Sequence, residues 1–141
     1  MVLKPNGVSI TLRARAYAPG TPISATVVNH LAHTIYALDE KSDCSIAILE
    51  RRNGKSWQPI RGCALRRLPR VVAIASGHNH PVMIDPHSYN FGVIPGTARP
   101  AFGAGTYRIM VTYRFTPDLT AVDLYRAYSK TFSIRPAGAS R

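Results

Sequence analysis

Two cysteines, Cys44 and Cys63, are the residues of this 141-residue chain whose spacing points most directly to chemistry. Asn53-Gly54 lies midway between them, and this dipeptide is the strongest short-range signal for a two-residue hairpin turn, because both turn positions need positive φ. With Asn53 and Gly54 as the turn, the same register carried along both strands sets the cysteines opposite each other. Opposite Cα atoms in a ladder lie about 4.5–5.5 Å apart, within reach of a disulfide. The sequence therefore predicts a Cys44–Cys63 disulfide that staples a hairpin over residues 44–63.

Other chemistry fits the cysteines less well. A structural zinc site usually has a Cys-x2–4-Cys spacing and a redox pair has Cys-x-x-Cys, and neither pattern occurs. Two buried free thiols in a reducing compartment remain the alternative, and a bulge at Pro59 would shift the register by one residue. Because disulfides persist outside the reducing cytosol, the pairing predicts an extracytoplasmic protein, whether secreted, periplasmic or on the cell surface. The opening MVLKPNG does not have the pattern of a signal peptide, so we expect a mature domain that begins with an added Met.

Three histidines, His78, His80 and His87, lie close together in the segment HNHPVMIDPH, with Met83 among them. A His-x-His pair on one face of a strand can bind copper or zinc, and methionine favours Cu(I). Prolines interrupt this segment, however, and an isolated His-x-His pair commonly arises without a metal. We therefore expect no metal site and no cofactor, and keep the three histidines as the candidates should a metal bind.

No pattern in the sequence predicts catalysis. A Gly-x-Ser-x-Gly nucleophile elbow, a phosphate-binding loop and a His-Glu-x-x-His motif are all absent. Asp85 and His87 are two residues apart, but a dyad also needs a nucleophile that spacing cannot place. Seven carboxylates are few for a glycosidase, which needs a pair across a cleft. The sequence predicts a protein that is not an enzyme.

Positive charge is concentrated in residues 51–70. The chain has 18 Lys and Arg against 7 Asp and Glu, a formal net charge of +11. Residues 51–70 contain no acid and hold seven of the cations: Arg51, Arg52, Lys55, Arg61, Arg66, Arg67 and Arg70. Such a stretch could bind a sulfated or uronic polysaccharide or another anionic polymer, or be a solvated basic face. Nucleic acid is the least expected polyanion, because single-strand binding needs interleaved aromatics and only Trp57 is present.

Strands dominate the pattern that positions these residues. Segment 105–115 alternates Tyr107, Ile109 and further apolar residues with polar ones, as a half-buried strand does. The other expected strands are 8–15, 23–29, 34–39, both arms of the 44–63 hairpin, 70–75, 81–85 and 124–134. This predicts an all-β fold, a two-sheet antiparallel sandwich of about seven to nine strands over residues 8–135, with a closed barrel as the alternative. Residues 1–7 are expected to be an extension and 136–141 a disordered tail.

Four segments carry a resemblance to a known family. They are YAPGTPISATVVN, the hairpin CSIAILERRNGKSWQPIRGC, SGHNHPVMID and GAGTYRIMVTY. Together they resemble bacterial immunoglobulin-like domains of surface proteins and lipoproteins, which are related to small proteinase-inhibitor-like sandwiches. The resemblance covers about residues 8–135, implies an immunoglobulin-like fold and supplies no catalytic residues. The stretch 86–105 departs from the family pattern. Tyr107 is also expected to place its hydroxyl on an upstream loop, as in a tyrosine corner.

These observations favour a non-enzymatic extracytoplasmic module that binds a protein or an anionic polymer through its loops and sheet edges. Self-association by strand addition at the first or last strand is one form of this function. An alternative is a proteinase inhibitor that presents loop 92–105, with Arg99 before Pro100, although a proline after the scissile residue disfavours cleavage. A further alternative is the polyanion binder described above. No apolar run is long enough to span a membrane.

Overall fold

Eleven strands and one 3-10 helical turn make up the computed structural model, which describes residues 7–39, 45–60, 68–88, 102–118 and 123–136. The elements are β1 (Val8–Leu12), β2 (Ala16–Tyr17), β3 (Ile23–Asn29), β4 (Ile35–Asp39), β5 (Ala47–Asn53), β6 (Ser56–Ile60), β7 (Arg70–Ile74), β8 (Asn79–Ile84), η1 (Pro86–Ser88), β9 (Gly105–Tyr113), β10 (Tyr125–Tyr128) and β11 (Phe132–Ile134). The strand count exceeds the predicted seven to nine because the expected strand 124–134 is divided into β10 and β11, and because the short strand β2 follows the expected strand 8–15.

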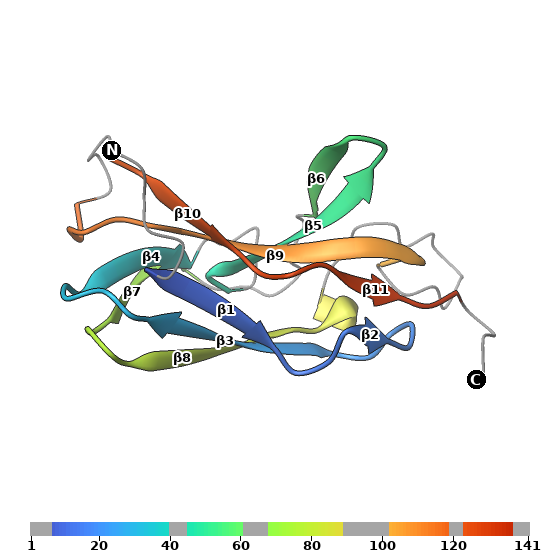
Figure 1. Cartoon of the computed structure of the whole chain (residues 1–141), viewed down its shortest axis with the longest axis horizontal. Helices are drawn as coiled ribbons and strands as arrows, with labels where there is room; N and C mark the ends of the chain where they lie inside the picture. Colours follow the sequence, from blue (N-terminus) through green and yellow to red (C-terminus); the bar gives the residue numbers. More distant parts are fainter. Residues whose placement is uncertain (1–6, 40–44, 61–67, 89–101, 119–122, 137–141) are drawn as a thin grey trace.

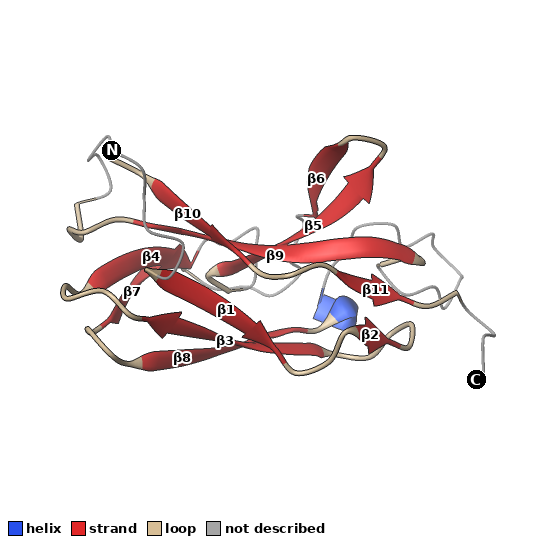
Figure 2. Cartoon of the chain, in the orientation of Figure 1, coloured by secondary structure: helices blue, strands red, loops and turns tan. Residues whose placement is uncertain are grey.

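Two of the sheets face each other as the layers of a sandwich (Figure 1). One layer has the order β1-β3-β8, and the other has the order β2-β11-β9-β5-β6, with β10 also paired to β9. β4 and β7 form a small third sheet, joined to the end of β9 by two backbone hydrogen bonds between Tyr36 and Arg114. Strands make up nearly all the regular structure of the described residues (Figure 2). The all-β antiparallel sandwich predicted from the sequence is confirmed.

The chain changes sheets between β1 and β2. β1 pairs antiparallel with β3, whereas β2 pairs parallel with β11 in the opposite layer. Strict alternation in the sequence over 8–15 predicts a single strand, but the strand ends at Leu12 and the chain crosses over at residues 13–15. The Tyr17 hydroxyl accepts a hydrogen bond from the Ala14 N–H (3.1 Å) and holds this corner. The chain therefore passes from one layer to the other at residues 13–15.

A bulge divides the expected strand 124–134. Four residue steps separate the pairs Tyr128–Met110 and Phe132–Tyr107 on the β10–β11 side, against three on β9. The extra residue disrupts the ladder, as bulges do. Ser129 restores the hydrogen bonds to β9 at this point. Its N–H donates to the Ile109 carbonyl (2.8 Å), and its hydroxyl accepts a hydrogen bond from the Ile109 N–H (2.9 Å).

The β5–β6 turn differs from the predicted one. Asn53 pairs with Ser56, so the two turn residues are Gly54 and Lys55, and Gly54 takes the positive φ (64°) of the first turn position. The Ser56 hydroxyl donates to the Asn53 carbonyl (3.0 Å) and closes the turn. The register that set Cys44 opposite Cys63 is therefore wrong. Both cysteines lie outside the described residues, and the disulfide itself stays a prediction.

The core lies between the two layers and is centred on β9. Tyr107 and Ile109 are fully buried there, and the Tyr107 hydroxyl donates to the Gly103 carbonyl (2.5 Å). This contact to a residue just upstream confirms the expected tyrosine-corner role. Burial raises the pKa of the Tyr107 hydroxyl above its ordinary value, against a smaller opposing effect of the Arg51 charge. Phe132 stacks on the Tyr107 ring and extends the core to β11.

We expect Ile109→Ala to lower the free energy of unfolding by about 2–5 kcal/mol, since it empties a fully buried site in the central strand. Thr112→Ala, on the opposite face of the same strand, should cost about 0.5 kcal/mol or less. Denaturant melts of both variants measure the difference. Equal losses at the two sites would contradict the assignment of β9's faces.

Candidate functional site

The described residues include part of each predicted basic or loop site. Arg51, Arg52, Lys55 and Arg70 are described, whereas Arg61, Arg66, Arg67, Arg99 and Pro100 lie outside the described residues. Most of the proposed inhibitory loop 92–105 lies outside them too, so that proposal has no structural account.

The cations of the β5–β6 hairpin do not share one face. Arg51 and Arg52 are consecutive in a strand, so their side chains point to opposite sides. Arg51 turns toward the start of β9, where its Nη2 donates to the carbonyl of Ala104, the residue before the strand (2.9 Å). A Cβ on Gly105 would stand 3.1 Å from the Arg51 Nε, so glycine leaves the room that this arginine occupies. The hairpin projects from the sandwich (Figure 1). The side chains of its three cations are exposed.

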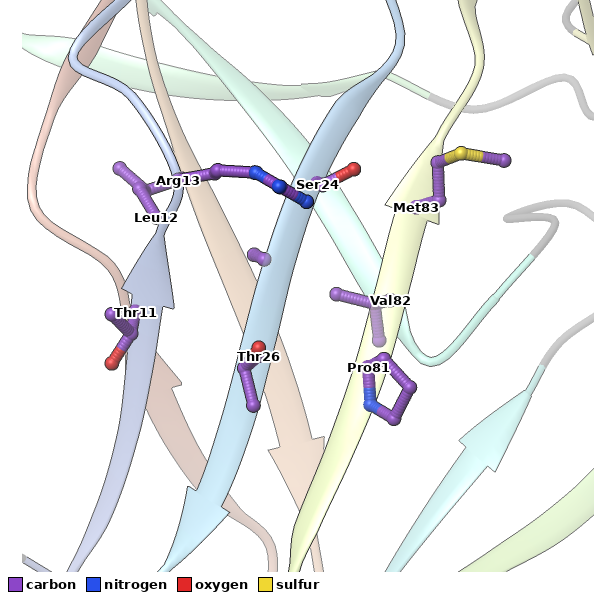
Figure 3. Close-up of a pocket in the computed structure, with 9 residues that line it drawn as sticks. Thr11, Leu12, Arg13, Ser24, Thr26, Pro81, Val82 and Met83 are labelled. Atoms are coloured by element: carbon purple, nitrogen blue, oxygen red, sulfur yellow. The ribbon is translucent and has the colours of Figure 1, made fainter.

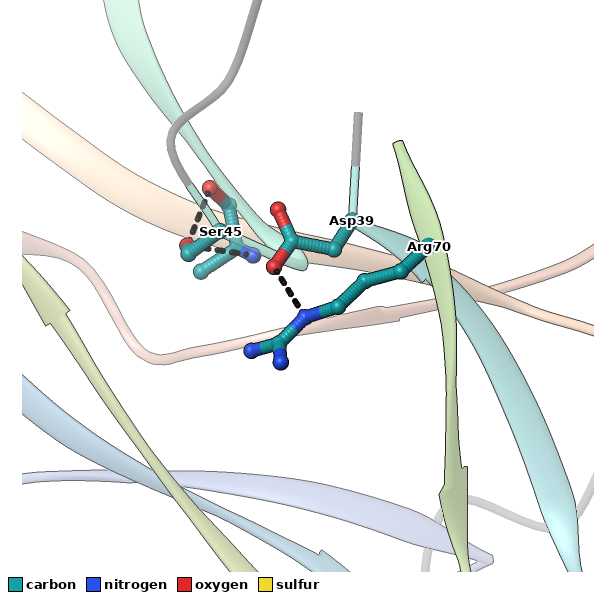
Figure 4. A network of polar contacts seen from close by, with 4 residues as sticks. Asp39, Ser45 and Arg70 are labelled. Atoms are coloured by element: carbon teal, nitrogen blue, oxygen red, sulfur yellow. Dashed lines mark hydrogen bonds and ion pairs between the residues drawn. The ribbon is translucent and has the colours of Figure 1, made fainter. Parts of the chain in front are cut away.

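Arg70 is separated from the hairpin cations. It lies on β7 in the two-stranded sheet, and its Nε contacts Asp39 Oδ2 at 3.3 Å (Figure 4). The Asp39 side chain is only 4% exposed, whereas that of Arg70 is 68% exposed. Ser45 lies beside the pair, and its hydroxyl exchanges hydrogen bonds with the backbone N–H and carbonyl of Ala47, the first residue of β5. The described cations of the 51–70 stretch therefore do not form the continuous stripe that sequence proximity predicts.

A different charged cluster lies on the outer face of the larger sheet. Arg108 Nε contacts Glu50 Oε1 at 2.6 Å. The Arg108 guanidinium lies between two rings, 4.3 Å from the Trp57 centroid and 4.0 Å from that of Tyr128. Its members come from β5, β6, β9 and β10, so sequence proximity could not reveal it. The available signal was the polar phase of the alternating segment 105–115, in which Arg108 faces away from the core.

The candidate metal ligands do not converge in the described structure. His80 falls in the core-facing phase of β8 with buried Val82, whereas Met83 lies on the opposite face and is 58% exposed. His78 lies in the turn before β8, and the His87 side chain is outside the described set. Among the residues that are described, no group of three His, Cys, Asp or Glu side chains stands close enough to hold a metal ion.

A shallow depression of about 610 Å³ lies across β1, β3 and β8 (Figure 3). Its polar groups are hydroxyls of Thr11, Ser24 and Thr26 and the Arg13 guanidinium, beside the exposed Met83. Hydroxyls and a guanidinium can donate hydrogen bonds to a ligand.

Two edge strands carry a proline on their free side. Pro81 lies in β8. Just before this strand, the Asn29 N–H donates to the His78 carbonyl (3.1 Å), and bonded positions alternate along an antiparallel ladder, so the nitrogen of Pro81 faces away from β3. Pro59 lies in β6 next to a bonded position of the two-residue hairpin, and its nitrogen likewise faces outward. A proline here blocks pairing with another strand while sparing the native ladder.

β1 and β10 are edge strands without a proline. Hydrogen bonds from His30 N–H to the Gly7 carbonyl (2.9 Å) and from Arg13 N–H to the Ser24 carbonyl (3.3 Å) flank β1. Bonded positions alternate along an antiparallel ladder, so the odd-numbered residues of β1 bond to β3. The even-numbered residues turn their backbone N–H and C=O groups to the free side, and these are Val8, Ile10 and Leu12.

A groove of about 490 Å³ runs along this free side, between β1 and β10. Its lining combines the whole of β1, one residue of the crossover that follows it, and two residues beside the bulge: Val8, Ser9, Ile10, Thr11, Leu12, Arg15, Tyr128 and Lys130. The lining includes two cations and no acid. Among the described residues no strand pairs with this side of β1, so the groove combines the outward backbone groups of an edge strand with positive charge.

The comparisons with known proteins define a fold. No protein-family model matches the chain, and no curated protein matches it. A chain in the structure of the Salmonella enterica SafA pilin in complex with the SafB chaperone superposes with a TM-score of 0.50 at 12% identity, over 95% of this chain and 56% of that one. This chain therefore spans just over half the length of the chain that it matches. The fold is an immunoglobulin-like β-sandwich, as the sequence resemblance implied.

Two glycosidases give slighter likenesses. A β-glucosidase from Erythrobacter marinus has a TM-score of 0.40 at 15% identity, over 91% of this chain and 15% of its own. A β-glucosidase from Listeria innocua in complex with gluconolactone has a TM-score of 0.34 at 12% identity, over 89% and 16%. Scores this low carry no inference about function. Separately, none of the described helices is long and apolar enough to cross a membrane.

Proposed function

We propose that the chain is a non-enzymatic extracytoplasmic structural or binding module that joins a partner protein by strand addition at the free edge of β1. The observation that carries this proposal is the contrast between edges. Pro59 and Pro81 block the free sides of β6 and β8, while β1 keeps three residues with outward backbone groups along a groove. An edge left open next to blocked ones is suited to pairing with an extended segment.

The partner segment has a definable chemistry. An added strand would place alternate side chains toward the groove, which is lined by the buried Val8 and Ile10 and the partly exposed Leu12. Arg15 and Lys130 favour carboxylates on that segment. A second copy of this chain, at +11, would meet electrostatic repulsion. An acidic extended segment of another protein is therefore the occupant we propose.

The remaining support is coarser. The Salmonella structure contains a pilin together with a chaperone, two proteins associated with each other, and its fold is shared here. An extracytoplasmic location agrees with that neighbour and with the predicted disulfide.

Proline scanning of the edges tests the proposal. The probes are a ten-residue peptide that alternates valine with glutamate and one that alternates valine with lysine, with binding followed by fluorescence anisotropy at 0.15 M salt. We expect the acidic peptide to bind, and Leu12→Pro to weaken it about tenfold or more by removing an outward N–H of β1, a loss equivalent to about 1.4 kcal/mol.

Met83→Pro is the matched control. It makes the same change on the other edge of the same sheet, at an exposed residue whose nitrogen also faces outward, and neither substitution alters the charge. Thermal melts verify that both variants are folded. Equal weakening by the two prolines, or no binding of the acidic peptide to the wild type, would overturn the proposal.

A further inference from the structure

We propose that the outer face of the β6-β5-β9-β10 sheet binds an anionic polysaccharide, independently of strand addition at β1. The register places Arg52, Arg108 and Arg126 on this face, on three adjacent strands. Trp57 and Tyr128 stand among them, Trp57 directly opposite Arg52 and Tyr128 two residues along β10 from Arg126. Sequence proximity could not join these residues, because they come from positions 52 to 128.

The spacing of the cations suits an extended polymer. Strands lie about 4.8 Å apart and residues advance about 3.4 Å along each. Arg52 is therefore about 8 Å from Arg108 by backbone position, and Arg126 is about 14 Å from it on the other side, so the three form a diagonal row. Charges at these separations act together on a chain that crosses all three strands, whereas a small anion would meet only one or two.

The centre of the row is fixed in place. Arg108 is held by Glu50 and by the two flanking rings, with contacts of 2.6, 4.3 and 4.0 Å. Glu50 pairs with Arg108 and offsets much of its positive charge, so the exposed Arg52 and Arg126 supply most of the attraction to a ligand, and Arg108 fixes the two rings between them. Arg52 and Arg126 are exposed on either side and can form paired hydrogen bonds to carboxylate or sulfate groups.

Polysaccharide fits this face better than single-stranded nucleic acid. Bases bind by stacking on free aromatic faces. One face of each ring, on Trp57 and on Tyr128, is already occupied by the Arg108 guanidinium. An anionic sugar chain needs only hydrogen-bond donors, which the guanidinium groups and the phenol hydroxyl of Tyr128, a residue that is 44% exposed, provide. Nucleic acid is accordingly an outcome of the test.

The experiment uses heparin, a polymer with sulfate and uronic carboxylate groups, and the full chain. The variant Arg52→Glu/Arg126→Glu is compared with the control Arg13→Glu/Arg135→Glu, and each double reversal lowers the net charge from +11 to +7, because each Arg→Glu change removes two units. All four arginines are exposed, so both variants should fold as the wild type does. Kd is measured from 0.05 to 0.5 M salt.

We expect the face variant to bind heparin at least about tenfold more weakly at 0.15 M salt. The negative slope of log K against log salt should become shallower by about two. The control should change Kd by about threefold or less. Equal weakening would show only attraction to net charge and would overturn the proposal. Tighter binding of a single-stranded oligonucleotide than of heparin would overturn the choice of polysaccharide. Leu12→Pro should leave heparin binding unchanged, so this proposal and the proposed function fail separately.

Discussion

Replacing Asn29 by aspartate is expected to lower the free energy of unfolding by about 3–5 kcal/mol. Asn29 ends β3 and is fully buried. Its Nδ2 donates to the carbonyls of His33 (2.8 Å) and Ile74 (2.9 Å), and its Oδ1 accepts the Leu31 N–H (2.9 Å). The amide therefore ties the loop after β3 to the end of β7. An aspartate has the same shape but no donor when ionised, so two carbonyls would face a buried negative charge.

Urea melts of Asn29→Asp at pH 7 measure this loss. Asn53→Asp is the matched control, because it makes the same change at an exposed position of the β5–β6 hairpin and should cost about 0.5 kcal/mol or less. The deficit of Asn29→Asp should narrow on acidification, since a protonated carboxyl recovers one donor. A loss no larger than that of the control would mean that the Asn29 hydrogen bonds do not stabilise the fold.

Replacing Arg108 by methionine is expected to cost about 3 kcal/mol. The change removes the cation from Glu50, whose side chain is 9% exposed, and leaves a carboxylate largely buried and unpaired. We expect the low end of the range for breaking a buried ion pair, because the Arg108 side chain is itself 23% exposed. Its cation–π contacts with Trp57 and Tyr128 are lost as well.

A double variant separates the ion pair from the packing. Glu50→Met/Arg108→Met removes both charges, and such replacements of a buried pair by apolar residues are often close to neutral, so it should recover most of the stability. Arg52→Met, the same substitution at an exposed neighbour on β5, should cost about 0.5 kcal/mol or less. If the double variant is no more stable than Arg108→Met, stranding of the Glu50 charge is not the cause of the loss.

Local patterns in the sequence predicted the fold class and most strands. The expected strand 23–29 matches β3 residue for residue, and 105–115 exceeds β9 by two residues. Alternation reports which face of a strand is buried, and that is a local property. It does not report which sheet a strand joins, so the change of layers after Leu12 could not be read from 8–15. The bulge at Ser129 was hidden likewise, because it depends on a contact with a distant β9 residue.

The candidate sites depended more heavily on tertiary structure. Asn53-Gly54 correctly located a hairpin, but the turn residues are Gly54 and Lys55, not Asn53 and Gly54. This shift of the turn by one residue changes every pair along the β5–β6 ladder. The basic stretch 51–70 was predicted as one surface from proximity in sequence, but Arg70 belongs to another sheet and pairs with Asp39. The cluster around Arg108 and the free edge of β1 arise from strands brought together by folding. Their contacts are non-local, and one sequence does not specify them.

Amide hydrogen exchange, measured residue by residue by NMR, tests strand addition at β1 most directly. In the free protein, the amides of Ser9 and Thr11 should be protected by β3, while Val8, Ile10 and Leu12 should exchange rapidly from the open edge. Saturation with the valine–glutamate peptide should slow exchange at Val8, Ile10 and Leu12 and leave the outward amide of Met83 on β8 unchanged. Slowing at Met83 instead, or binding of the peptide with no change at the three β1 amides, would contradict the account.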